Sequence, residues 1–221
     1  MMSDATIANA RSNLFRLLAL GYSHPTAEIH AAMASGAYQT EIKTCADIAG
    51  FTITDIPVVT SDLAEFEAEY IDLFQFGQNG RPEVPLHAGD YEKISAGRSR
   101  SEFMLEYTKW YRHFGLKTRD DPEATELPDH ITCQLEFLSW LAHLEATADP
   151  ESSICIGYQK AQHDFMERMA SPFLNSVAIR LSGQSDTGDA APLFIALAEL
   201  ALTTDRAHLN HPEPAVIGAN P

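Results

Sequence analysis

The sequence of 221 residues lacks the features of a secreted, disulfide-bonded or membrane-spanning protein. Its three cysteines, Cys45, Cys133 and Cys155, are widely separated and include no CxxC pair, so neither a disulfide framework nor a zinc ribbon is indicated. It has no run of 18 apolar residues, and its start, MMSDATIANARSNLF, lacks the basic and apolar stretches of a secretory signal. We therefore expect a cytoplasmic protein with no stable membrane insertion.

Basic residues are also scarce. Lysine and arginine together number 15 against 31 aspartates and glutamates, and the net charge is −16. Binding to nucleic acid relies on lysine and arginine to neutralise phosphates, so a nucleic-acid partner is not expected. A basic peptide would instead be attracted, and added salt would weaken that attraction. The acidity could equally serve only to keep the protein soluble, and the charge alone does not separate these two interpretations.

The motifs of common enzymes and metal sites are absent. The chain contains no GxSxG, no GxxxxGK[ST], no GxGxxG, no HExxH and no paired ExxH. His130 with Cys133, and His208 with His211, are pairs without further ligands at diagnostic spacing. We expect no catalytic residues, no metal and no cofactor. A helical-bundle metal-binding protein or enzyme is the alternative, and a stoichiometric bound metal would favour it.

Helical periodicity is the strongest pattern present. Apolar residues recur at spacings of three and four, which predicts helices ending at Gly21, within 26–49 with a break near Gly36, and over 61–76, 101–115, 129–145, 151–182 and 190–206. The β-branched stretch 50–60 is the weakest part of this prediction, because its residues favour strands. The patterns indicate an all-α, single-domain bundle of seven to nine helices over residues 1–207, followed by an irregular tail over 208–221.

The first informative segment joins an acidic helix to a long loop. Ser61 is a good N-cap residue, and after it Phe66, Tyr70, Leu73 and Phe74 share one helical face. Residues 77–97 contain too many glycines and prolines for a regular helix, which predicts a long ordered loop. Loops of this length are usually functional or disordered.

The second informative segment is the helix start Pro128-Asp129-His130. Asp129 could cap the helix by accepting a backbone N–H, which is a sufficient structural reason for an aspartate there. His130 has no such role, and a charged histidine is unfavourable at the positive end of a helix. A neutral His130 beside Asp129, presented at a groove, is therefore a candidate recognition element.

Together these segments resemble the TorD/DmsD/NarJ family of chaperones for molybdenum enzymes. The resemblance rests on Glu69-Tyr70-Ile71-Asp72-Leu73-Phe74 followed by Gly77, Pro82, Pro85, Leu86, His87 and Tyr91, and on Pro128-Asp129-His130 followed by Leu135-Glu136-Phe137-Leu138. The Pro-Leu-His variant resembles chaperones of the dimethylsulfide, selenate and ethylbenzene dehydrogenase type more than those for trimethylamine oxide reductase. The chain departs from the family pattern at Gln134, where the family has a glutamate, and at Ala88 and Gly89, where it has a more polar pair.

The resemblance implies a chaperone that is not an enzyme. Such a protein binds the twin-arginine signal peptide, the apoprotein, or both, of a molybdoenzyme catalytic-subunit precursor, aids cofactor insertion and delays export, as a monomer or homodimer. An acidic groove edged by apolar side chains would complement an arginine pair joined to an apolar stretch. The expected peptide-binding residues are Glu69, Tyr70, Asp72, Phe74, His87, Asp90, Tyr91, Asp129 and His130. For Tyr70, Leu73, Phe74, Phe137 and Leu138 the favoured interpretation is a place in the core.

Overall fold

The computed structural model describes residues 2–77, 80–116, 127–184 and 188–208. Most of the predicted tail lies outside these residues. Nine helices of eight residues or more are present in the described part, together with the single-turn α5. Their bounds are α1 Asp4–Gly21, α2 Ala27–Ala34, α3 Ala37–Ala49, α4 Leu63–Phe74, α5 Glu92–Ser95, α6 Arg100–His113, α7 Ile131–Thr147, α8 Ser153–Phe165, α9 Ser171–Ser182 and α10 Ala190–His208.

The all-α prediction is confirmed, because the described residues contain no strand. The β-branched stretch 50–60 runs as an extended connection without a partner strand in that part of the chain. The loop 77–97 holds a 3₁₀ turn at Ala88–Asp90 and the short α5. A π-helical turn over Met166–Ala170 links α8 to α9.

Side-chain caps fix where the first and fourth helices begin. The hydroxyl of Ser3 accepts a hydrogen bond from the Thr6 amide at 3.2 Å and so caps the start of α1. The prediction that Ser61 caps the next long helix is wrong by one residue, because the carboxylate of Asp62 accepts from the Glu65 amide at 3.0 Å. Both residue types are good caps, so the local sequence does not choose between them.

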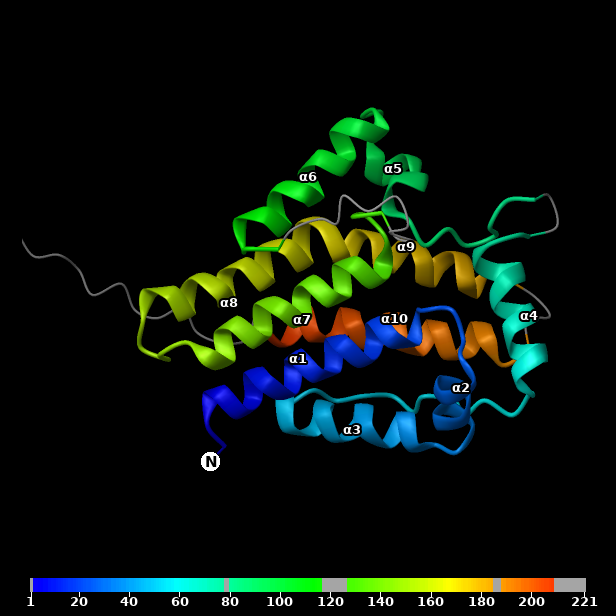
Figure 1. Cartoon of the computed structure of the whole chain (residues 1–221), viewed down its shortest axis with the longest axis horizontal. Helices are drawn as coiled ribbons and strands as arrows, with labels where there is room; N and C mark the ends of the chain where they lie inside the picture. Colours follow the sequence, from blue (N-terminus) through cyan, green and yellow to red (C-terminus); the bar gives the residue numbers. More distant parts are fainter. Residues whose placement is uncertain (1, 78–79, 117–126, 185–187, 209–221) are drawn as a thin grey trace, which may run out of the picture.

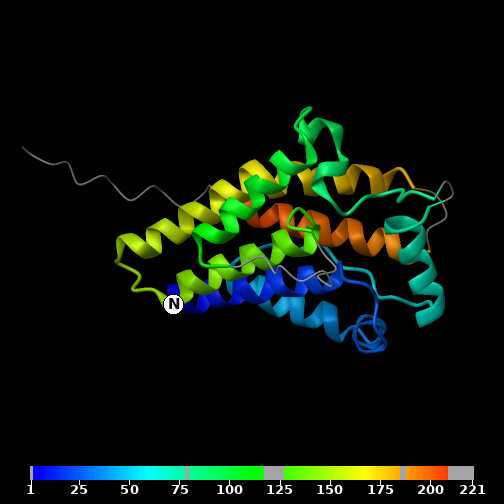
Figure 2. The ribbon, with the colours of Figure 1, turned by 45° about the horizontal axis from the view of Figure 1, so that its top comes forward.

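The helices pack as an elongated bundle in which α1 lies along α7, α9 along α10, and α3 against α1 (Figure 1). The turned view shows the same pairs, with α4 standing across one end of the bundle and α5 and α6 lying on the outside (Figure 2). The predicted core residues Tyr70, Leu73, Phe74, Phe137 and Leu138 are all buried. None of the described helices combines the length and the apolar character needed to cross a bilayer.

An aromatic cluster fastens α4 to the bundle. The ring of Phe194 on α10 is fully buried, and its centroid lies 4.7 Å from that of Phe74 and 6.0 Å from that of Tyr70. The Tyr70 hydroxyl also donates to the backbone oxygen of Tyr22 at 3.0 Å. These contacts fix the C-terminal half of α4 beside the loop that follows it.

Candidate functional site

The two informative segments meet through a short antiparallel pairing. The Ala88 amide donates to the backbone carbonyl oxygen of Asp129 at 3.1 Å, and the Ile131 amide donates to the backbone carbonyl oxygen of Leu86 at 2.9 Å. His87 and His130 face each other across this pairing, with ring centroids 4.8 Å apart. Segments some forty residues apart in the sequence therefore form one site at the start of α7.

Asp129 lies beneath this site and is fully buried. Its carboxylate accepts hydrogen bonds from the Gly89 amide at 2.9 Å, from His87 Nδ1 at 3.3 Å and from Arg100 Nη2 at 3.5 Å. Burial alone would raise the pKa of Asp129, but the hydrogen bonds from His87 and Gly89 and the charge of Arg100 hold this pKa below its ordinary value. The carboxylate thus stays ionised and secures the loop over residues 87–89 to α7.

The prediction that Asp129 caps α7 is wrong, and so is the prediction that His130 has no capping role. The N-cap is His130, whose Nδ1 accepts from the Thr132 amide at 3.3 Å and lies 2.7 Å from the Thr132 hydroxyl. Burial, reinforced by the nearby His87, lowers the pKa of His130 to about 3, against the pull of Asp129. His130 is therefore neutral, as expected, but only 6% of it is exposed.

A hollow of about 160 Å³ opens beside the histidine pair. Its walls come from the end of α4, the loop over residues 82–90 and the start of α7. It is lined by Tyr70, Phe74, Gln75, Pro82, Pro85, Leu86, His87, Asp90 and His130. Its volume is below the range of most small-molecule sites, roughly 300–1,000 Å³, and suits one or two side chains of a larger partner.

Five of the nine expected peptide-binding residues line this hollow: Tyr70, Phe74, His87, Asp90 and His130. The other four lie apart from its surface. Glu69 accepts from the Ala190 amide at the start of α10, and Asp72 is exposed on α4. Tyr91 is buried between Phe173 and the guanidinium of Arg180, and Asp129 supports the hollow from below.

Two residues of the site were not predicted. Gln75 lines the hollow at the end of α4, and Arg100, at the start of α6, contacts both Asp90 and Asp129. The sequence contains a signal for Arg100: basic residues are scarce, and an arginine close in sequence to an acidic motif is a natural ion-pair partner for that motif. Gln134, a departure from the family pattern, donates its amide to the Asp129 backbone oxygen at 2.9 Å.

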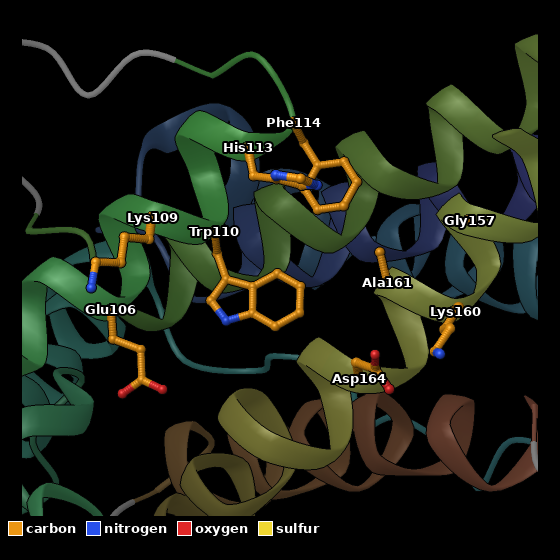
Figure 3. A pocket seen from close by; sticks show the side chains of 9 residues that line it. All are labelled: Glu106, Lys109, Trp110, His113, Phe114, Gly157, Lys160, Ala161 and Asp164. Carbon is orange, nitrogen blue, oxygen red and sulfur yellow. The ribbon is translucent and has the colours of Figure 1, made fainter.

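A larger hollow of about 460 Å³ lies between α6 and α8, and none of the residues that line it belongs to the two informative segments (Figure 3). Trp110 projects into it beside Phe114 and Ala161. Charges of both signs surround these apolar side chains, from Glu106, Lys109, Lys160 and Asp164. This mixed rim does not match the acidic, groove-like site that the sequence predicts.

The described residues include no group of three histidine, cysteine, aspartate or glutamate side chains placed to hold a metal ion. Cys45 and Cys155 are buried free thiols, and burial raises the pKa of each. The histidine pair at 208 and 211 lies outside the part of the chain whose side chains are described.

The low pKa of His130 predicts a pH-dependent stability. The unfolded chain takes up a proton at His130 as the pH falls below about 6.5, whereas the folded protein does so only near pH 3. Protonation therefore favours the unfolded state, and His130 should remove about 2 kcal/mol of unfolding free energy between pH 7 and pH 5. We expect His130→Gln to lose the cap, about 1 kcal/mol at pH 7, and to be less sensitive to acid.

Urea denaturation of both proteins at pH 7 and pH 5 measures this difference. The gap between wild type and His130→Gln should narrow, or reverse, at the lower pH. Parallel pH profiles for the two proteins would show that His130 titrates normally in the folded state.

Both informative segments lie in a region of the chain that is similar to known proteins. The sequence model of the family described as nitrate reductase delta subunit matches residues 36–178, which include both informative segments. The dimethyl sulfide dehydrogenase assembly chaperone protein of Rhodovulum sulfidophilum is 34% identical over 191 residues, covering 83% of this chain and 74% of that protein. The perchlorate reductase assembly chaperone protein of Dechloromonas aromatica (strain RCB) is 31% identical over 208 residues, covering 90% and 88%. The chlorate reductase assembly chaperone protein of Ideonella dechloratans is 31% identical over 121 residues, covering 55% and 60%.

Proposed function

The chain belongs to the nitrate reductase delta subunit family, which confirms its resemblance to the TorD/DmsD/NarJ chaperones, and on that premise we propose that it is an assembly chaperone for a molybdenum-cofactor oxidoreductase. Its relatives are named as assembly chaperones of a dehydrogenase and of reductases. The family is one of chaperones and not of catalysts, so the prediction that the chain is not an enzyme is confirmed.

We propose further that the hollow beside His87 and His130 binds the twin-arginine signal peptide of the catalytic-subunit precursor. By holding this peptide in the cytoplasm, the chaperone delays export until the cofactor has been inserted. The observation that carries this proposal is the composition of the hollow, whose lining includes both the acidic residue Asp90 and the aromatic residues Tyr70 and Phe74. The chain would act as a monomer or a homodimer.

The surface around the hollow offers further apolar contact. Phe76 follows Gln75 directly, and 66% of its surface is exposed. An exposed aromatic residue that directly follows a residue of the hollow's lining is a suitable support for the apolar stretch of a signal peptide. The arginines would then lie toward Asp90, where charge-assisted hydrogen bonds are stronger than neutral ones.

A peptide carrying the twin-arginine motif and its apolar stretch should bind more tightly than the same peptide with both arginines replaced by glutamine. We expect a difference of about three- to tenfold in Kd, because a partly exposed charged hydrogen bond contributes about 1 kcal/mol. Raising the salt concentration should narrow the difference, since salt screens exposed charges but not apolar burial.

Fluorescence anisotropy of labelled peptides at low and high salt gives both values. Equal affinities at low salt would mean that the acidic surface does not recognise the arginines. Absence of binding by either peptide would remove the signal-peptide proposal while leaving the assembly role open to other parts of the precursor.

A further inference from the structure

Arg100 is already paired with the acidic side chain that lines the hollow. Its Nη1 donates to Asp90 Oδ1 at 3.0 Å, and its Nη2 donates to Asp129 Oδ1 at 3.5 Å. Asp90 is the carboxylate that lines the hollow. A guanidinium of the chain therefore already makes the contact that an arginine of a bound peptide would make.

The backbone is shaped to admit this guanidinium. A Cβ atom at Gly89 would lie 2.5 Å from Arg100 Nη1 and 3.0 Å from Asp129 Oδ2, so a larger residue would push the arginine away. The Gly89 amide also donates to Asp129 at 2.9 Å. Glycine at this position thus allows the arginine and the carboxylate to approach the loop together.

The two contacts of Arg100 differ in how readily they can be exchanged. Arg100 and Asp90 are each about two-fifths exposed, and pairs of this kind contribute little net free energy and rearrange easily. Asp129 is fully buried and also accepts from Gly89 and His87, so it stays satisfied if the arginine shifts slightly. A peptide arginine entering the hollow would meet Asp90 first and could replace Arg100 there, while Arg100 keeps its contact with Asp129 and the buried carboxylate stays paired.

We infer that Arg100 is a built-in competitor, which holds Asp90 until a peptide arginine displaces it. This inference rests on the proposed function, because it concerns the same hollow. It explains how an acidic site can stay closed to weakly bound cations and yet accept an arginine that is delivered together with an apolar stretch. Because every ligand must displace Arg100 from Asp90, the affinity for simple cations is lowered. Ligands that also make apolar contacts with the hollow are therefore favoured.

Arg100→Gln tests the inference, with Arg98→Gln as the matched control. Arg98 is equally exposed, but it pairs with Glu106 and packs over Phe103, away from the hollow. Both variants make the protein more acidic by one charge, so any general gain in attraction for a cationic peptide is shared. We expect Arg100→Gln to bind the twin-arginine peptide about two- to fivefold more tightly than Arg98→Gln, a factor that corresponds to release of one exposed ion pair.

The glutamine-substituted peptide should bind equally to the two variants, because it has no arginine to compete with Arg100. If Arg100→Gln binds the twin-arginine peptide no better than Arg98→Gln does, Arg100 is a support of the hollow and the inference is wrong.

A second measurement does not depend on any client peptide. In Arg100→Ala the space of the guanidinium is empty, and methylguanidinium should raise the melting temperature of this variant more than sodium chloride does at equal ionic strength. The wild type and Arg98→Ala should show no such excess. If the peptide binds but methylguanidinium gives no extra rise in melting temperature, the proposed function stands and the inference that Arg100 competes with the peptide is wrong. Rescue without binding of either peptide would support a guanidinium subsite and overturn the proposed signal-peptide function.

Discussion

Replacing Arg11 with methionine is expected to lower the free energy of unfolding by about 3–5 kcal/mol, the usual effect of removing one partner of a buried ion pair. Arg11 on α1 pairs with Glu145 on α7, and both side chains are 8% exposed. Glu145 also accepts from Gln162 Nε2 at 2.7 Å and from Gln159 Nε2 at 3.0 Å, both on α8. Without the guanidinium, this carboxylate would remain buried with only neutral donors.

For a chain of this length, the loss corresponds to a fall in melting temperature of about 6–20 °C. Urea denaturation at pH 7 measures the change in free energy directly. Arg98→Met serves as control, because its partly exposed pair with Glu106 should contribute no more than about 1 kcal/mol. The double variant with methionine at 11 and 145 should recover much of the stability, since it leaves no unpaired charge. A double variant less stable than Arg11→Met would contradict this explanation.

Phe194→Ala is expected to destabilise the protein by a similar amount, about 3–5 kcal/mol, because it leaves a cavity in a fully buried aromatic cluster. The ring lies between Tyr22, Tyr70 and Phe74, at centroid distances of 5.3, 6.0 and 4.7 Å. Two of these rings form the α4 side of the hollow. The truncation should therefore weaken peptide binding even at temperatures where the protein remains folded.

Phe194→Leu serves as the matched control for Phe194→Ala, because it replaces the ring without leaving a large cavity. It keeps most of the buried volume and should cost less than about 1.5 kcal/mol, with a smaller effect on Kd. Peptide titrations well below each melting temperature compare the three proteins. Unchanged Kd in folded Phe194→Ala would show that the α4 side of the hollow does not contribute to binding.

The helices follow closely from the sequence, because a three- and four-residue apolar repeat is a local property. The pattern over 61–76 corresponds to α4 at Leu63–Phe74, and Gly36 separates α2 from α3 as expected. The residue types in the stretch 50–60 favour strands, but a strand needs a partner. None lies beside it in the described part of the chain, and so the local preference is not realised.

The candidate site can be predicted from the sequence less completely than the helices, because its geometry depends on contacts between segments that are distant in the chain. Tyr70, Phe74, His87, Asp90 and His130 come together as the motifs predict. The cap of α7 belongs to His130 and not to Asp129, because the pairing of residues 86–88 with 129–131 turns the aspartate inward toward Gly89. Capping preferences describe one helix end in isolation and contain no information about such a pairing. The role of Arg100 likewise depends on the position of α6.

The measurement that tests the central proposal most directly is residue-specific photo-crosslinking to a twin-arginine signal peptide. A photoreactive benzoylphenylalanine is placed either at Gln75, which lines the hollow, or at His113, in the larger hollow between α6 and α8. The proposal predicts a strong crosslink from position 75 that weakens when both peptide arginines are replaced by glutamine, and only background from position 113. A crosslink from position 113 with none from position 75 would contradict it and place the peptide in the larger hollow between α6 and α8.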